Sequence, residues 1–360
     1  IAKFFGIPVK LHYSFAFIFL YIAYISYTYK LTFDNAIFLS AMILTMFVCV
    51  VLHEYGHALV ALKFGIKTED IILSPIGGVA RLYRNPEKPK EEFLIAIAGP
   101  LVNVAIAVLL FLTLWIIGQS NIGLESLNDL QYFKISDFLG PLIYINVILF
   151  LFNLAPAFPM DGGRILRALL SIKMDRLKAT KIASIIGRVL AVVFIILGLY
   201  TSNYIWAFIG VFIFTMARLE YQQLVMSKLM KETVATDLVN RDFTKINHTD
   251  DYSRVLEVYK RGIEKNFLVF DQDDFIVGSV PELFIKKTIK EKDLMMPVVS
   301  RMSQQVSTIP HFTLLDEIIK TLKQGIAIVG VTEGGVLIGV IDRNIVMDFM
   351  KRNSKLGFIG

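Results

Sequence analysis

The chain has 360 residues, of which 55% are hydrophobic and 19% are charged, and its mean hydropathy is +0.60. This composition excludes an ordinary soluble globular protein, because long uncharged stretches account for the excess of apolar residues. The formal net charge of +6 is better explained by membrane topology than by nucleic-acid binding, and we expect no nucleic-acid partner. The single cysteine, Cys49, excludes an internal disulfide.

The apolar stretches divide the chain into two predicted domains. Residues 1–226 contain nearly all of the long apolar runs, whereas residues 227–360 have the composition of a soluble domain. Six stretches each have about 18 or more mostly apolar residues, which is the length that a bilayer-spanning helix needs. These predicted spans cover 12–30, 36–64, 91–118, 137–155, 179–200 and 203–223. The expected fold class is a mainly α membrane protein: a six-transmembrane-helix bundle with a small β segment between helices two and three, plus an α/β domain.

Lysine and arginine residues gather in alternate loops of this predicted bundle. Arg81 and Arg84 lie between the second and third spans, and Arg164 and Arg167 lie between the fourth and fifth, whereas Lys30 is alone in the first loop. By the positive-inside rule, the chain is expected to be a multi-pass protein of the cell membrane. Both termini and the C-terminal domain would then be cytoplasmic.

The second predicted span contains the sequence His53-Glu54-Tyr55-Gly56-His57. Two histidines four residues apart lie on one helix face and can hold one metal ion, with Glu54 beside them as a base. Ionisable side chains inside an apolar helix are costly and usually functional. This cost favours a metal site over the alternative of two buried, hydrogen-bonded core histidines. At about 1.5 Å per residue, the motif would lie roughly 10–15 Å below the cytoplasmic interface.

Between the second and third spans, residues 71–73 and 79–82 are predicted to form short strands around a turn that contains Gly77 and Gly78. A strand edge close to the metal could hold an extended substrate by β-augmentation. We therefore expect Gly77 and Gly78 to contribute to substrate binding. The alternative is a structural hairpin whose glycines only make the turn.

The fourth predicted span leads into a segment with two prolines that stop the helix and two glycines that permit a sharp turn. Asp161 is therefore expected on irregular backbone, at the depth of the two histidines, as the third metal ligand. Two histidines, a carboxylate and an open position make a catalytic zinc site. The alternative for Asp161 is a helix cap before Gly162. Asn153 could donate to an oxyanion, or it could make a helix–helix hydrogen bond instead.

Together these motifs resemble the site-2 protease family of intramembrane zinc metalloproteases, in the branch with a cytoplasmic regulatory tail. The matching segments are 53–57, 74–79, 98–103 and 153–163. The resemblance implies hydrolysis of a peptide bond in or near a transmembrane segment of a membrane-bound regulatory protein. It also implies one Zn²⁺ per chain held by His53, His57 and Asp161, with Glu54 as the catalytic base and Asn153 near the substrate.

Residues 236–353 contain a duplicated unit. Each copy has a helix pattern followed by a strand pair, namely 267–270 with 275–280 and 326–331 with 336–341. This arrangement resembles a tandem CBS domain, a regulatory module that often binds adenine nucleotides. Nucleotide-binding copies usually carry Ser or Thr after the glycine of the last strand, and Asp three residues later. These two positions hold Pro281 and Phe284 in the first copy and Asp342 and Ile345 in the second. Nucleotide control is therefore one alternative beside formation of a homodimer, substrate gating or a purely structural role.

The main alternative function is a CBS-regulated transporter or channel whose intramembrane histidines and carboxylates bind a moving ion. Transporters often contain repeated spans and broken helices, and no such repeat is visible in this sequence. A zinc-binding scaffold without catalysis is disfavoured because Glu54 is intact.

Overall fold

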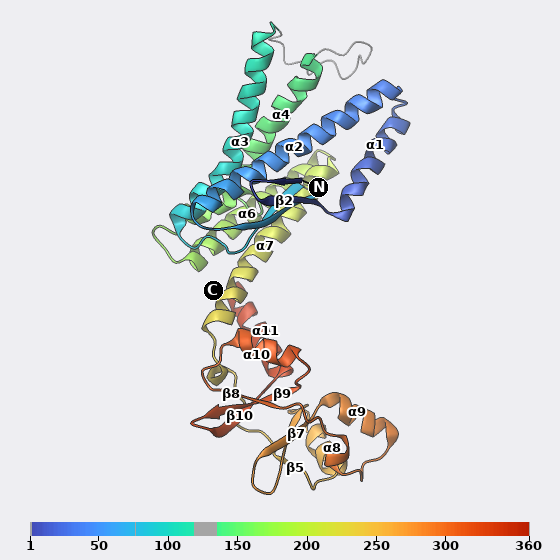
Figure 1. The fold of residues 1–360 in the computed structure, drawn as a ribbon, viewed down its shortest axis with the longest axis vertical. Helices are drawn as coiled ribbons and strands as arrows, with labels where there is room; N and C mark the ends of the chain where they lie inside the picture. Colours follow the sequence, from blue (N-terminus) through green and yellow to red (C-terminus); the bar gives the residue numbers. More distant parts are fainter. Residues whose placement is uncertain (1, 76, 119–134, 360) are drawn as a thin grey trace. The chain divides into compact units, whose positions relative to one another are not determined.

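The computed structural model describes residues 2–75, 77–118 and 135–359. The chain forms two compact units, 1–221 and 222–360 (Figure 1). The border between them falls inside helix α7 (Tyr204–Glu232). The predicted domain border at 226/227 also falls within this helix.

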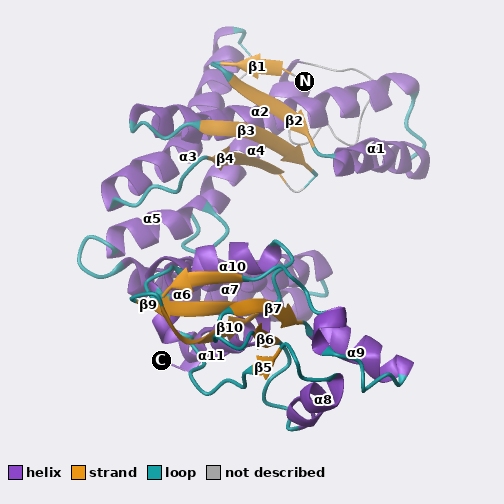
Figure 2. Cartoon of the chain, turned by 60° about the horizontal axis from the view of Figure 1, so that its bottom comes forward, coloured by secondary structure: helices purple, strands orange, loops and turns teal. Residues whose placement is uncertain are grey.

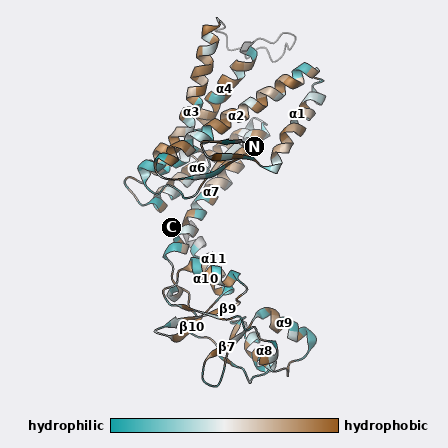
Figure 3. Cartoon of the chain, in the orientation of Figure 1, coloured by the Kyte–Doolittle hydropathy of each residue, from teal (hydrophilic) through white to brown (hydrophobic). Residues whose placement is uncertain are grey.

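Six apolar helices occupy the predicted spans of the first unit. Their bounds are α1 (Ala16–Thr28), α2 (Phe33–Lys63), α3 (Pro89–Ile116), α4 (Ile135–Asn153), α6 (Arg176–Tyr200) and α7. Within the described residues, α2, α3, α6 and α7 are long and apolar enough to cross a membrane, whereas 13–28 and 137–153 are shorter apolar helices. Apolar residues cover these helices along most of their length (Figure 3). The chain is thus a membrane protein, and the number of six spans stays a prediction.

The ends of α2 follow from local sequence. The Thr32 side chain caps the N-terminus by accepting a hydrogen bond from the Asn35 N–H, and Asp34 lies in the first turn. Lys63 lies in the last turn, where a cation is favourable to the helix dipole. Gly65 follows with a positive φ of 72°, which ends the helix.

The short helix α5 (Asp161–Leu170) begins directly at Asp161. The expected sharp turn at Gly162 and Gly163 is wrong, because both glycines lie inside this helix. A Cβ atom at Gly162 would lie 2.3 Å from the carbonyl oxygens of Leu154 and Ala155. The two glycines therefore let α5 pack directly on the segment that follows α4.

A four-stranded sheet packs against α2 (Figure 2). Its strands are β1 (Ala2–Phe4), β2 (Ile7–Leu11), β3 (Thr68–Ser74) and β4 (Gly77–Leu82), in the order β1-β2-β3-β4. The hairpin β3–β4 lies between α2 and α3 in the chain, whereas β1 and β2 were not predicted. Strand β2 pairs parallel to β3, and the other two pairs are antiparallel. The buried side chains Ile7, Val9 and Ile71 share a core with Tyr55 and Ala58 of α2.

Asp70 of β3 is fully buried and links three strands by charge. Its carboxylate accepts hydrogen bonds from Lys10 Nζ at 2.6 Å, from Arg81 Nε at 2.6 Å and from Arg81 Nη2 at 2.5 Å. The Arg81 guanidinium, helped by Lys10, lowers the pKa of Asp70 from 3.8 to about 2. The sheet is therefore cross-linked at its centre by a carboxylate that is charged at neutral pH.

The second unit consists of two copies of one three-stranded motif. The first copy contains β5 (Ile246–Asn247), α8 (Tyr252–Lys260), β6 (Phe267–Phe270), β7 (Ile276–Val280) and α9 (Glu282–Glu291). The second contains β8 (Ser307–Pro310), α10 (Leu315–Lys323), β9 (Ile328–Glu333), β10 (Val336–Asp342) and α11 (Arg343–Ile359). In both copies the first strand pairs parallel with the second, and the second pairs antiparallel with the third. Both predicted strand pairs are present, as β6–β7 and β9–β10.

The substitution Asp70→Asn should lower the free energy of unfolding by about 1–3 kcal/mol, because hydrogen bonds to a charged group are lost. Because the pKa of Asp70 lies below its ordinary value of 3.8, this stabilisation is present above that pH and is lost as the pH falls through about 2. Thermal unfolding in detergent micelles, measured from neutral pH down to acid, tests both statements. The control Glu69→Gln removes a half-exposed carboxylate that contacts the same Arg81 at 3.4 Å. Equal melting temperatures for the two variants would contradict the assignment.

Candidate metal centre

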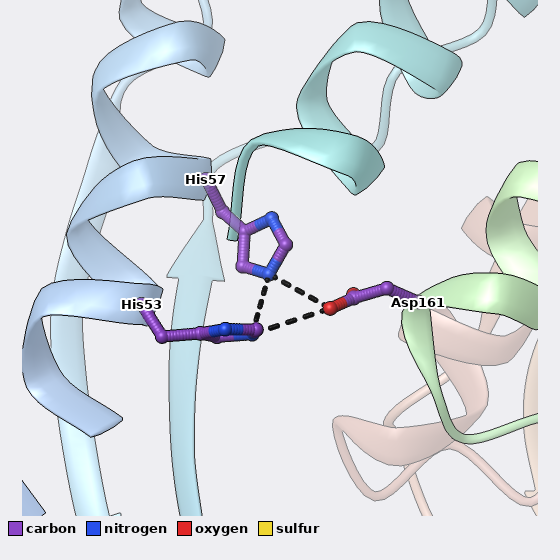
Figure 4. A group of neighbouring side chains, drawn as sticks. All are labelled: His53, His57 and Asp161. Atoms are coloured by element: carbon purple, nitrogen blue, oxygen red, sulfur yellow. Dashed lines mark hydrogen bonds and ion pairs between the residues drawn. The ribbon is translucent and has the colours of Figure 1, made fainter. Parts of the chain in front are cut away.

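Helix α2 carries His53 and His57 on one face, one turn apart. Both residues are buried, with relative exposures of 6% and 5%. Their Nε2 atoms lie 3.1 Å from each other (Figure 4). The spacing of four residues therefore brings two potential ligand atoms to one point, as the sequence predicts.

Asp161 approaches the same point from α5. Its Oδ2 atom lies 3.2 Å from His53 Nε2 and 3.1 Å from His57 Nε2 (Figure 4). Asp161 was expected on irregular backbone or as the cap of a helix that begins at Gly162. Both expectations are wrong, because Asp161 is the first residue of α5 and Met160 is the N-cap. The carboxylate is thus held by a regular helix with a relative exposure of 7%.

The three side chains fit a zinc ion. Each residue offers one ligand atom, and all three atoms lie within 4.8 Å of one another. Ligand atoms placed about 2 Å from zinc in tetrahedral directions lie about 3.3 Å apart, which is close to the separations of 3.1 and 3.2 Å in this cluster. A tetrahedral zinc ion bound by these three atoms would have a fourth position for water or substrate.

The backbone of α3 orients the imidazole of His57. His57 Nδ1 lies 2.7 Å from the carbonyl oxygen of Ile95, so Nδ1–H donates and the Nε2 lone pair points to the cluster. His53 Nδ1 is buried and has no hydrogen-bond partner within the described residues. Ile95 could not be predicted from the sequence, because a backbone carbonyl leaves no signal in residue type.

Gly99 of α3 makes room for both imidazoles. A Cβ atom at this position would lie 2.3 Å from His57 Nε2 and 2.7 Å from His53 Nε2. On the neighbouring helix, a Cβ at Gly56 would lie 2.9 Å from the Ala98 carbonyl oxygen. The segment 98–103, which resembles the family, therefore lies where α3 approaches α2 closely beside the cluster.

The Glu54 carboxylate contacts the sheet. Its Oε2 atom accepts a hydrogen bond of 3.0 Å from the backbone N–H of Ala80 in β4. A Cβ at Gly78 would lie 2.8 Å from Glu54 Cγ, so this glycine permits the contact. Gly77 has a φ of 137° and open space around its Cβ position. The structure thus places Gly78 against the expected base and Gly77 at the start of the strand.

Asn153 is the last residue of α4 and is partly exposed. No hydrogen bond joins its side chain to the cluster in the described part of the chain. Its role in binding substrate or the reaction intermediate stays a prediction.

In the second unit, Asp342 occupies a position where nucleotide-binding CBS copies usually carry serine or threonine. Its carboxylate caps α11 by accepting from the Ile345 N–H at 2.9 Å, and it accepts from Asn266 Nδ2 at 2.7 Å. Asn266 Oδ1 in turn accepts from the Glu282 N–H at 3.0 Å. Asn266 of the first copy and Asp342 of the second therefore satisfy each other's hydrogen-bonding groups at this position.

Comparison with known proteins places the first unit in a family context. The sequence profile of peptidase family M50 matches residues 41–125 and 119–197. A zinc metalloprotease of Methanocaldococcus jannaschii is 39% identical over 241 residues, which are 66% of this chain and 64% of that protein. A protein of Synechocystis sp. is 39% identical over 146 residues, which are 40% of this chain and 35% of that protein. The chain therefore spans less than two thirds of the length of either relative.

Two solved structures are similar to parts of this chain. A site-2 protease from Methanocaldococcus jannaschii has 39% sequence identity and a TM-score of 0.46, over 61% of this chain and 94% of that chain. A CBS-domain protein from Agrobacterium tumefaciens has 21% identity and a TM-score of 0.30, over 32% of this chain and 92% of that chain.

The substitution Gly99→Ala should weaken zinc binding at least tenfold, because the new methyl group must displace both imidazoles. Losses of 10- to 100-fold are typical when the surroundings of metal ligands are disturbed. Zinc affinity of the detergent-solubilised chain, measured by competition with a chromophoric chelator, tests this expectation. Leu101→Ala is the matched control, because Leu101 lies on the same helix and is 53% exposed. Unchanged affinity in Gly99→Ala would contradict the role of this glycine.

Proposed function

The membrane unit of this chain belongs to peptidase family M50, and on this premise we propose that the chain is an intramembrane zinc metalloprotease. It would hydrolyse a peptide bond in or near a transmembrane segment of a membrane-bound regulatory protein. The observation that carries the proposal is the convergence of His53, His57 and Asp161 from two helices on one buried point. The zinc-metalloprotease relative from Methanocaldococcus jannaschii supports Zn²⁺ as the metal.

The proposed roles follow from the placement of each side chain. His53, His57 and Asp161 would hold one zinc ion. A zinc ion in such a site lowers the pKa of water and polarises a carbonyl group. Glu54 adjoins His53 in the helix, so its carboxylate could accept a proton from the attacking water and deliver it to the leaving amine. Asn153 would donate to the developing oxyanion.

The outer edge of β4 is the proposed substrate-binding edge. In the described sheet β4 is an edge strand, and the Ala80 N–H faces Glu54 instead of pairing with β3. A substrate segment that pairs with β4 would take over this N–H, and Glu54 would then be free to act as the base. Gly78 keeps the edge close to Glu54, and Gly77 would let the strand begin without a side chain in the way.

The proposed topology places the site near the cytoplasmic face of the cell membrane, with six spans and both termini in the cytoplasm. At about 1.5 Å per residue, about 9 Å of helix rise separate His57 from Lys63, the last residue of α2. The basic residues that follow α2 support a cytoplasmic loop at this end. Water could then reach the site without crossing the whole bilayer.

The duplicated second unit supports a regulatory CBS-like role. Homodimer formation through this unit is one proposed mode, and adenine-nucleotide binding is another. The Asp342 carboxylate favours the first mode, because a negative charge at this position opposes a phosphate group.

A transporter or channel is the less favoured function. An ion pathway would use Glu54 as part of the ion site, whereas its carboxylate contacts the β4 backbone. The assignment to a peptidase family favours hydrolysis as well.

The substitution Glu54→Gln should reduce cleavage at least about 100-fold, because general acid–base catalysis contributes 10²- to 10⁴-fold. The zinc content per chain should not change. Both are measured in liposomes that contain the full chain and a panel of single-span membrane proteins, with Glu69→Gln as the carboxylate control. Cleavage that persists at the parent rate would remove Glu54 from its role. An ion flux through the same liposomes, without cleavage, would support the transporter instead.

The substitution Ala80→Pro should raise the KM for a cleaved membrane protein about tenfold, because one backbone hydrogen bond of about 1–1.5 kcal/mol is lost. The proline replaces an N–H that does not belong to the ladder with β3, so an edge strand can tolerate it. Ala80→Val is the matched control, since it adds similar volume and keeps the N–H. Equal KM values for the two variants would contradict substrate pairing on β4.

A further inference from the structure

A buried network of charges lies outside the metal centre and has no part in the proposed chemistry. It joins Arg167 of α5 to Glu92 of α3 and to Glu220 of α7. The Arg167 and Glu92 side chains are only 7% and 4% exposed. Charges buried this deeply are costly unless they are paired.

Arg167 is held from three sides. Its Nε and Nη2 atoms lie 2.7 and 2.5 Å from Glu92 Oε1, and Nη1 lies 2.6 Å from Glu220 Oε1. The guanidinium also lies 4.9 Å from the centre of the Phe158 ring. Arg176 of α6 contacts the other oxygen of Glu92 at 3.5 Å. Two cations and two carboxylates thus balance one another across four helices.

The network lies on both flanks of Asp161 in the chain. Phe158 precedes this residue, and Arg167 follows it six residues later in the same short helix. An α-helix is rigid over two turns, so fixing Arg167 also fixes the direction of the Asp161 carboxylate. Gly162 and Gly163 hold the start of α5 against the segment after α4, and Arg167 holds its later part.

One face of α3 connects the network to the histidines. Glu92, Ile95 and Gly99 are three and seven residues apart and therefore lie on one side of the helix. Glu92 holds Arg167, the Ile95 carbonyl accepts from His57, and Gly99 contacts both imidazoles. Helix α3 thus sets the distance between α2, which carries the histidines, and α5, which carries Asp161.

We propose that Arg167 is a positioning residue for Asp161, and that Glu92 and Glu220 hold it in place. The inference rests on the proposed function, because it takes Asp161 as a zinc ligand. Loss of one of these contacts would let α5 rotate, and the carboxylate would leave the point where the two imidazoles meet.

Three variants of the full chain in detergent micelles test the proposal. Glu220→Gln keeps the volume of a side chain that is one third exposed, Arg167→Met removes the central charge, and Arg167→Lys restores the charge without the fork of donors. The matched controls are Glu232→Gln on α7 and Lys178→Met on α6, which remove exposed charges. The metal is removed with a chelator and Zn²⁺ is titrated back in competition with a chromophoric chelator.

The zinc dissociation constant should rise severalfold in Glu220→Gln and about tenfold or more in Arg167→Met, with partial recovery in Arg167→Lys. The visible absorption of the Co²⁺-loaded chain should change in the same order, because it reports the coordination geometry. The controls should match the parent chain in both measurements. Should Arg167→Met fail to fold, Glu220→Gln carries the test alone.

Parent-like zinc affinity and an unchanged cobalt spectrum in a folded Glu220→Gln or Arg167→Met variant would overturn the positioning role. An equal loss in the control variants would overturn it as well. A parent chain that binds no zinc would instead overturn the proposed function, so the two failures are distinguishable.

Discussion

Two imidazoles and one carboxylate meet at a buried point between α2 and α5, and the packing of the membrane unit depends on keeping them there. Without close partners, a carboxylate in an apolar helical environment would be strongly unfavourable. The contacts of 3.1 and 3.2 Å between Asp161 and the histidines satisfy this demand. They also require that three helices approach more closely than ordinary side chains would allow.

Small residues and backbone groups make that approach feasible. Gly99 leaves out a side chain where α3 faces the imidazoles. Gly56 leaves out a side chain where α2 faces the backbone of α3. Gly162 and Gly163 let α5 rest on the backbone that follows α4. Packing of this kind stabilises helices in a membrane, where hydrophobic burial between helices contributes little. The same glycines therefore serve helix association and the geometry of the site.

A network of charges lies on one side of the cluster, and the edge of the sheet lies on the other. On the first side, the charges of Glu92 and Arg167 connect α3 to α5, and Glu220 adds α7. On the other side, Glu54 accepts from the Ala80 N–H on the outer edge of β4, which is an edge strand of the described sheet. The proposed peptide hydrolysis would use both properties, since the ligands must stay fixed while an extended substrate pairs with the strand.

The sequence by itself determined what depends on local spacing. The interval of four residues places His53 and His57 on one helix face. Short runs of strand-favouring residues beside turn residues predict the hairpin β3–β4 and the two strand pairs of the second unit. Only the tertiary structure decided which elements meet. It placed Gly99 against the imidazoles and Arg167 against Glu92. It also placed Asp161 at the start of a regular helix and β2 parallel to β3. The physical reason is that periodicity reports the environment of one element, whereas these contacts join residues as far apart as Glu92 and Arg167. Such pairs depend on the rotation and depth of whole helices, which many weak packing contacts set together.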